Sequence, residues 1–461
     1  MKNQYDVLII GAGPAGIFAA LELVERSSLR VAILEKGRNL AERRCPSSER
    51  KIACTQCAPC SITSGWGGAG AFSDGKLTLS TEVGGFLDDY ISKEKLHKLI
   101  REVDDIYLKF GAPAEVYGTD EEAIAKIEKK AVMADLRMIP SRIRHLGTGR
   151  TQTVLQGMQD YLKQKGVAII TGEEAGELIV DGERRLKGIR TAGGQEYLGR
   201  YVVVGPGREG SDWLVREAAR LKLGSVVNPV DIGVRVEIPA EVLEEMTAVI
   251  FETKFVYYSK TFEDKVRTFC MCPHGEVVME NTDGLITVNG HSHAERKTAN
   301  TNFSLLVSKT FTQPFHEPIT YGRHIAGLAN LLSGGVIVQR LGDLHHGRRS
   351  TKERLLKGLV KPTLEEAIPG DLSLVLPYRH LLAILEMLKA LDAIAPGINS
   401  RNTLLYGVEV KFYSSRLHVK SNLETEIPNL YAVGDGAGVT RGLMQASISG
   451  VMAAREIAHR G

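Results

Sequence analysis

Three closely spaced glycines follow the first apolar run of the chain, residues 7–10, and lead into a helical pattern. We expect Gly11 to form a tight turn and Gly13 to let backbone N–H groups approach a pyrophosphate. Gly16 would allow the helix to pack closely against the strand. The first turn of a helix has N–H groups without partners and a favourable dipole, so this segment predicts a dinucleotide-binding site.

A second apolar run, residues 31–34, ends on Glu35, whose carboxylate can accept hydrogen bonds from ribose hydroxyls. A strand, a glycine turn, a helix, a second strand and a terminal acid in this order form a complete dinucleotide fingerprint. A chance strand, turn and helix is the alternative interpretation. Pro14 and Ala15 inside the turn, and Lys36 after the acid, complete the nucleotide-binding residues that we predict here.

The fingerprint does not by itself separate FAD from NAD, but another glycine-rich turn lies near the C-terminus. Strand-like residues 429–433 lead into Gly434, Asp435 and Gly436, and a helix of small residues runs from about Met444. This arrangement resembles the second flavin motif of the glutathione-reductase-like flavoproteins. The resemblance implies that Asp435 binds the ribityl chain and that the start of the helix points at the pyrophosphate and the flavin.

A third strand and turn, residues 201–204 followed by Gly205 and Gly207, has the same glycine spacing and two interpretations. It could open a separate fold for NAD(P)H, which would then serve as an external reductant. Alternatively, it is the returning strand of the FAD domain, since strand-like segments that suit a β-meander precede it. We favour the second interpretation, because no strand that ends in an acid lies about 20 residues further on.

The loop at residues 65–77 is more specific than these general motifs. Together with the cysteines before it, residues 269–273 and the C-terminal turn, it resembles a poorly characterised family of bacterial and archaeal FAD-dependent dehydrogenases over nearly the whole chain. The resemblance implies the fold and the flavin but no settled substrate. Backbone N–H groups of Gly67, Gly68 and Ala69 would approach the cofactor, and a mobile surface loop is the alternative.

Four of the six cysteines fall within 16 residues of the sequence: Cys45, Cys54, Cys57 and Cys60. Thiolates at this spacing can converge on an iron–sulfur cluster or on a structural zinc ion, and free thiols are the third interpretation. A redox disulfide like that of glutathione reductase is less expected. In that family the cysteines follow the paired glycines, and here residues 69–71, Ala-Gly-Ala, occupy that place.

The other two cysteines, Cys270 and Cys272, lie in a strand-like segment, so their side chains would face one side of it. These thiols, with His291 and His293, are our candidates for donating or accepting a proton at the substrate. Completing a metal site or filling the core are the alternatives for the two cysteines.

These motifs require an α/β fold in which distant parts of the chain meet at one cofactor. We predict a discontinuous, three-layer, Rossmann-like FAD-binding domain with a β-meander, made of residues 1–80, 135–225 and 400–461. Charged, helix-periodic residues 81–134 predict a helical insertion. Residues 226–399 alternate apolar and polar positions, which predicts an inserted α+β substrate domain with a mainly antiparallel sheet.

Composition narrows the class of protein. Glycine makes up 48 of 461 residues, above the usual ~7%, and clusters in the loops named above. The 58 basic and 55 acidic residues leave a formal charge of +3, which neither requires nor excludes a nucleic-acid partner. No apolar run of 18 residues and no signal-peptide pattern occur, so we expect a cytoplasmic protein without a membrane span.

The sequence as a whole predicts an FAD-dependent oxidoreductase that transfers hydride between the flavin and a small organic substrate. Basic clusters at residues 142–150 and 339–349 could attract an anionic substrate if the fold brings them together, and a solvated surface is the preferred alternative for the second cluster. Two alternatives stay open. One is a flavin-dependent RNA-modifying enzyme, and the other is an electron-transfer protein that pairs FAD with an iron–sulfur cluster and serves a partner protein.

Overall fold

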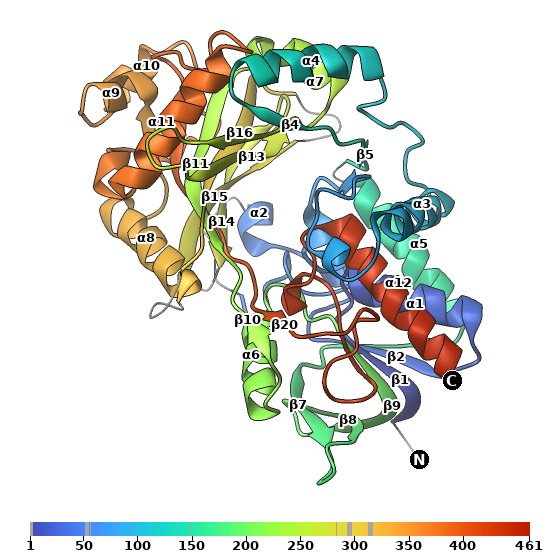
Figure 1. The fold of residues 1–461 in the computed structure, drawn as a ribbon. Coiled ribbons are helices and arrows are strands. Elements are labelled where there is room, and N and C mark those ends of the chain that lie inside the picture. Colours follow the sequence, from blue (N-terminus) through green and yellow to red (C-terminus); the bar gives the residue numbers. More distant parts are fainter. Residues whose placement is uncertain are drawn as a thin grey trace. The chain divides into compact units, whose positions relative to one another are not determined.

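The computed structural model describes residues 3–50, 55, 57–147, 149–282, 284–292, 297–311 and 317–461 (Figure 1). The chain divides into two compact units. The first comprises Met1–Glu115, Arg144–Asn228 and Tyr413–Gly461, and the second comprises Val116–Ile143 and Pro229–Phe412.

A seven-stranded sheet forms the centre of the first unit, in the order β6-β2-β1-β9-β8-β7, with β21 also paired to β9. Strands β6, β2, β1, β9 and β21 pair in parallel, whereas β7, β8 and β9 form an antiparallel meander. The predicted Rossmann-like fold with a β-meander is therefore confirmed. The strand bounds are β1 Gln4–Ile10, β2 Val31–Glu35, β6 Ala168–Thr171, β7 Ala175–Val180, β8 Leu186–Thr191, β9 Glu196–Val204 and β21 Leu430–Ala432.

Two helices of the first unit, α1 (Pro14–Arg26) and α12 (Leu443–Arg460), run side by side although they come from opposite ends of the chain (Figure 1). Both are rich in small residues, which lets their backbones approach. A side chain at Gly450 would begin only 2.0 Å from the carbonyl oxygen of Ala15. The remaining elements of this unit are α2 Pro46–Arg50, β3 Lys76–Thr78, α3 Lys93–Lys109, α5 Arg150–Gln164, α6 Ser211–Arg220, β10 Ser225–Val226 and β20 Arg416–Leu417; β5, Ile143–His145, pairs with β3 where the chain enters the unit.

We predict that Gly450→Ala destabilises the first unit despite the better helix propensity of alanine. The propensity gain is about 1 kcal/mol. The new methyl group would overlap rigid backbone of α1. Overpacking costs about 1–3 kcal/mol, and we expect the upper end here because backbone atoms cannot move aside. Denaturant unfolding should show the loss as a lower midpoint. Gly182→Ala is the matched control, because nothing lies within 4 Å of its new methyl group; a change above about 0.5 kcal/mol there would undermine the comparison.

An eight-stranded sheet forms the second unit, in the order β18-β17-β19-β11-β16-β13-β12-β4. Every pairing in it is antiparallel except that of β17 with β18, so the predicted mainly antiparallel sheet is confirmed. A two-stranded ribbon, β14 with β15, accompanies it. The strand bounds are β4 Arg137–Ile139, β11 Val230–Pro239, β12 Lys254–Tyr258, β13 Lys265–Cys272, β14 Glu276–Thr282, β15 Leu285–His291, β16 Asn300–Lys309, β17 Ile337–Arg340, β18 Ile368–Pro369 and β19 Leu404–Lys411.

The central strand β11 buries both of its faces. Its apolar residues, such as Ile232 and Val234, share a hydrophobic core with α11 (Tyr378–Asp392). Its alternate residues include Arg235 and Glu237, which are also fully buried. The alternation in the sequence thus separates an apolar interior from a polar interior. The other helices of this unit are α4 Glu121–Met133, α7 Glu244–Val249, α8 Pro318–Ser333, α9 Leu341–His345 and α10 Lys352–Leu356.

The segment predicted as one helical insertion, residues 81–134, is divided between the two units. Helix α3 belongs to the first unit and α4 to the second. Buried Leu96 and Leu99 of α3 join the first core, whereas Ala131 of α4 joins the second. Among the described helices, none is both long and apolar enough to cross a bilayer.

Candidate functional site

The turn between β1 and α1 has the geometry of a phosphate-binding turn. Gly11 has a φ of +95°, and a Cβ there would lie 2.2 Å from the carbonyl oxygen of Gly205 at the end of β9. A Cβ on Gly16 would lie 2.0 Å from the carbonyl oxygen of Gly11, so both positions exclude a side chain. A Cβ on Gly13 would meet no atom within 4 Å. Gly13 therefore borders open space at the start of α1, where an anionic group would meet the unpaired N–H groups of the helix.

Glu35 connects this turn to the glycine loop at residues 65–70. Its carboxylate is buried and accepts hydrogen bonds from the backbone N–H groups of Ala12 at 2.8 Å, Gly37 at 2.8 Å and Gly65 at 2.9 Å. Two of these bonds go to Oε1 and one to Oε2. Each carboxylate oxygen has two lone pairs, so Oε2 retains the capacity to accept from a ribose hydroxyl. Glu35 thus holds the loop in place and can still bind a sugar.

The glycine loop lies across the starts of α1 and α12. The N–H of Gly67 donates to the carbonyl oxygen of Ala12 at 2.8 Å, and a Cβ on Gly68 would lie 3.2 Å from the Cα of Gly13. A Cβ on Gly70 would lie 2.7 Å from the side chain of Leu443, the first residue of α12. Two helix N-termini and a loop of accessible backbone therefore converge on one region. The predicted residue Ala69 is exposed beside them.

Arg43 holds this loop, and the sequence analysis missed it. The buried guanidinium donates to the carbonyl oxygens of Trp66 at 2.6 Å and Gly68 at 2.9 Å, and it also reaches those of Ser61 and Ile62. Burial lowers the pKa of Arg43 to about 10, so it remains cationic at neutral pH. One arginine in a charged stretch carries no sequence signal for such a role.

The C-terminal turn packs directly against the other glycine turns. A Cβ on Gly436 would lie 2.3 Å from the carbonyl oxygen of Gly207, and one on Gly434 would lie 3.1 Å from the Cβ of Ala15. Residues predicted from three separate segments are therefore brought together. Met444 is buried in the first turn of α12.

Asp435 has polar partners that prepare it to accept a further hydrogen bond. Its carboxylate accepts from the hydroxyl of Thr440 at 2.7 Å and from the N–H of Gly442 at 3.1 Å. Burial raises the pKa of Asp435, and the positive charge of Arg208 opposes this shift. A carboxylate beside the start of α12 can hold a sugar hydroxyl while helix N–H groups hold a phosphate.

Lys36, in contrast, is engaged within the protein. Its Nζ lies 3.1 Å from the carboxylate of Glu209, and both side chains are partly exposed. To bind the cofactor as predicted, the ammonium group of Lys36 would therefore have to contact Glu209 and the cofactor at the same time. The ion pair joins the segment after β2 to the segment after β9.

We expect Asp435→Asn to lower FAD affinity about tenfold to a hundredfold without weakening the fold. A hydrogen bond to a charged group contributes about 1.5–3 kcal/mol, which sets this range. Because the folded-state pKa of Asp435 is raised, its ionisation costs stability as the pH rises above about 3.9, and asparagine removes that cost. Equilibrium titration with FAD and denaturant unfolding at neutral pH measure the two effects. Unchanged affinity would exclude Asp435 from the site.

The predicted cysteine metal site lies partly outside the described residues, since Cys54 is not among them. Cys45, Cys57 and Cys60 are free thiols. Within the described part of the chain, no group of three or more histidine, cysteine or acidic side chains is placed to hold a metal. The iron–sulfur and zinc interpretations stay predictions.

The second unit brings together Cys270, Cys272 and the end of β15. The two sulfurs are 3.9 Å apart, and the Sγ of Cys270 also lies 3.9 Å from the carbonyl oxygen of Gly290. His291 follows Gly290 as the last residue of β15, whereas His293 lies outside the described residues. The structure thus gathers three of the four predicted catalytic candidates in one region of the unit.

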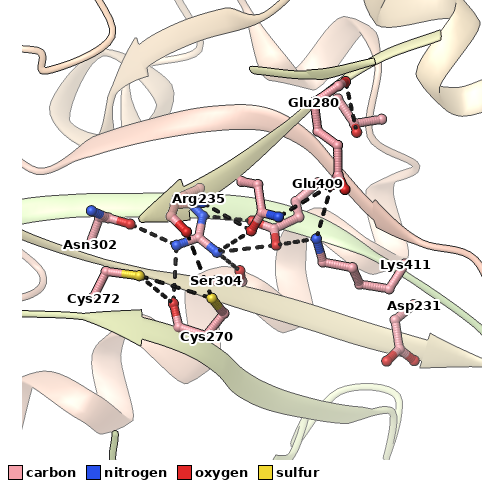
Figure 2. A network of polar contacts seen from close by, with 12 residues as sticks. Asp231, Arg235, Cys270, Cys272, Glu280, Asn302, Ser304, Glu409 and Lys411 are labelled. Atoms are coloured by element: carbon pink, nitrogen blue, oxygen red, sulfur yellow. Dashed lines mark hydrogen bonds and ion pairs between the residues drawn. The ribbon is translucent and has the colours of Figure 1, made fainter. Parts of the chain in front are cut away.

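A buried ion pair that the sequence analysis missed lies beside the two thiols (Figure 2). Arg235 of β11 and Glu409 of β19 are both 0% exposed, and Nε of Arg235 lies 2.9 Å from Oε2 of Glu409. The guanidinium also donates to Asn302 at 2.6 Å, to Ser304 at 2.8 Å and to the carbonyl oxygen of Cys270 at 3.1 Å. The one signal in the sequence is the presence of charged residues in two largely apolar strands, Arg235 in β11 and Glu409 in β19.

Two family models match separate segments of the chain. Residues 5–76 match the pyridine nucleotide-disulphide oxidoreductase family model. Residues 229–412 match a model described as FAD-dependent protein, C-terminal domain-like. The protein is an FAD-dependent oxidoreductase. The first match covers the β1 turn, Glu35 and the glycine loop. These residues fit FAD because they combine accessible backbone, the N-terminus of α1 and a carboxylate that can accept from a sugar hydroxyl.

This oxidoreductase is similar to an uncharacterized protein of Clostridium beijerinckii, with 27% identity over 484 residues, covering 98% of the present chain and 80% of that relative. Among solved structures it is similar to L-proline dehydrogenase from P. horikoshii, with 11% identity, a TM-score of 0.41 and coverage of 99% and 94% of the two chains. It is also similar to glycine oxidase from Bacillus cereus, with 13% identity, a TM-score of 0.39 and coverage of 99% and 98%.

Proposed function

We propose that the protein transfers hydride between bound FAD and a small organic substrate that carries an anionic group. One observation supports the flavin site best. The turn before α1, the glycine loop at residues 65–70 and the start of α12 contact one another, and Gly13 in this group borders open space. When bound, FAD supplies the hydride chemistry, and the protein supplies orientation and electrostatics.

Residues of the first unit would divide the work of binding. Backbone N–H groups at the starts of α1 and α12 would hold the pyrophosphate. Glu35 would accept from the ribose hydroxyls and Asp435 from the ribityl chain. Arg43 would keep the glycine loop closed over these groups through its bonds to Trp66 and Gly68.

Our proposal that the substrate is anionic rests on Arg208, an exposed cation of the first unit. Arg208 follows β9 in the turn after Gly207, and its charge acts on Asp435. Arg144, which belonged to the basic cluster in the sequence, forms two hydrogen bonds of 2.7 Å with Asp104 and is buried. Its charge is already compensated, so we assign attraction of the substrate to Arg208.

Anaerobic reduction of the full-length holoprotein tests this proposal. NADH, NADPH and panels of small carboxylates, phosphate esters, amines and neutral alcohols are added, and bleaching of the flavin absorbance is followed. We expect an anionic compound to reduce the flavin fastest. The Arg208→Gln variant should bind FAD normally and react about tenfold more slowly with that compound, while its reaction with chemical dithionite is unchanged. Bleaching by neutral or cationic compounds alone, or equal rates in the variant, would overturn the assignment.

A further inference from the structure

We propose that Cys270 and Cys272 form a reversible dithiol–disulfide couple in the second unit. The protein would then have a two-electron redox centre in addition to the flavin. The thiols lie two residues apart on β13, with their sulfurs 3.9 Å from each other. A disulfide bond is about 2.05 Å long, so the sulfurs need to approach by only about 2 Å.

The backbone between the thiols departs from regular strand geometry. The pairing of β13 with β16 shifts register between Phe269 and Cys272, which marks a β-bulge. Cys270 has a φ of +46°, a conformation that side-chain-bearing residues rarely adopt. Strain of this kind gathers at functional positions, where the surrounding structure maintains it. Here the bulge carries one cysteine of the pair.

A permanent positive charge lies next to the pair. The guanidinium of Arg235 donates to the carbonyl oxygen of Cys270 and has no exposure to solvent. Burial alone would lower the pKa of Arg235, but the carboxylate of Glu409 outweighs it and raises that pKa. Lys411 adds a second cation, which two carboxylates share: its Nζ lies 3.1 Å from Glu409 and 3.7 Å from Glu280. A neighbouring cation favours the thiolate, which is the nucleophile in disulfide exchange.

The two thiols differ in exposure, and this difference orders the reaction. Cys270 is half-buried, whereas Cys272 has 0% exposure. The thiolate of Cys270 would attack a small external disulfide, forming a mixed disulfide and releasing one thiolate. The thiolate of Cys272 would then attack the sulfur of Cys270, forming the internal bond and releasing the second thiolate. The external disulfide gains two electrons, and its two thiolates take up the two protons that the cysteines lose.

This pair is separate from the flavin-linked cysteines of glutathione reductase. In that family the cysteines follow the paired glycines. The present chain has Ala69 and Ala71 at that place, after Gly67 and Gly68. Cys270 and Cys272 lie instead on a strand of the second unit. The polar residues that surround this cysteine pair, Arg235 and Glu409, therefore also belong to the second unit.

Thiol trapping across a series of glutathione redox buffers tests the couple in the full-length holoprotein. Samples are quenched with acid, alkylated and digested, and the tryptic peptide that begins at Thr268 is weighed; it contains both cysteines and no others. We expect this peptide to lose two hydrogens at the oxidising end of the series and to regain them when reduced glutathione is added. Full alkylation of both thiols at the oxidising end would overturn the proposal.

Two single variants separate the steps. Cys272→Ser should stop at a glutathione adduct on Cys270, because the second thiolate is missing. Cys270→Ser should leave the buried Cys272 unmodified. Met133→Ser, at an exposed position at the end of α4, is the control and should oxidise at positions 270 and 272 as the wild type does. An adduct on Cys272 in the Cys270→Ser variant, or none on Cys270 in the other, would contradict the assigned order. Flavin content, measured in each sample, should stay constant, which separates this test from that of the flavin chemistry.

Discussion

Replacing Gly13 with valine should give a folded protein that no longer retains FAD. A Cβ at this position would meet no atom of the protein within 4 Å, and the φ of Gly13 is −77°, which valine tolerates. The same side chain would occupy the space in which we place the pyrophosphate. We expect the flavin content to fall below about a tenth of that of the wild type, a loss of more than about 1.4 kcal/mol of binding free energy.

The matched control is Gly11→Val, two residues earlier in the same turn. Its side chain would begin 2.2 Å from the carbonyl oxygen of Gly205, at a φ of +95°. This variant should lose both the fold and the flavin, which circular dichroism and flavin extraction can show. A Gly13→Val protein that keeps its FAD would mean that the pyrophosphate does not lie over the start of α1.

Replacing Arg235 with methionine should destabilise the second unit by about 3–5 kcal/mol. The substitution leaves Glu409 fully buried with only Lys411 as a charged partner, and breaking a buried ion pair costs about this much. Denaturant unfolding followed by probes in the second unit measures the loss. Arg142→Met is the control, because Arg142 and Glu121 form an exposed pair that contributes at most about 1 kcal/mol. Equal losses in the two variants would show that the buried pair does not hold the sheet together.

The same pair predicts how stability depends on pH. Burial alone would raise the pKa of Glu409, but the charges of Arg235 and Lys411 outweigh it and lower that pKa. A lowered folded-state pKa contributes stability above the ordinary value of about 4.3, and this contribution is lost as the pH falls through and below that value. In Arg235→Met, stability should fall less steeply over this range. A slope equal to that of the wild type would contradict the proposed coupling.

The flavin-binding motifs could be predicted because their signals are local. Gly11, Gly13 and Gly16 lie within six residues, and their spacing follows from the turn that they form. The strands that flank this turn are apolar because a parallel sheet with covered faces buries them on both sides, as β1 does. Such features depend on neighbouring residues and therefore appear in the sequence.

The features that the sequence did not reveal depend on contacts between distant residues. Arg235 and Glu409 are 174 positions apart and meet only because β11 pairs with β19. Arg43 acts on a loop that reaches it through the fold. The bulge at Cys270 interrupts a strand whose alternating pattern predicts regular geometry. Residue types alone do not specify these arrangements.

Flavin content of the purified full-length protein tests the central claim most directly. The protein is purified, denatured in acid, and the released cofactor is identified by mass and quantified against the protein. Our account predicts one FAD per chain in the wild type and in Cys270→Ser, and almost none in Gly13→Val. A wild-type protein that takes up no FAD, even when refolded or incubated with an excess of it, would contradict our central claim. That claim is that the glycine segments at residues 11–16, 65–70 and 434–438 bind one flavin.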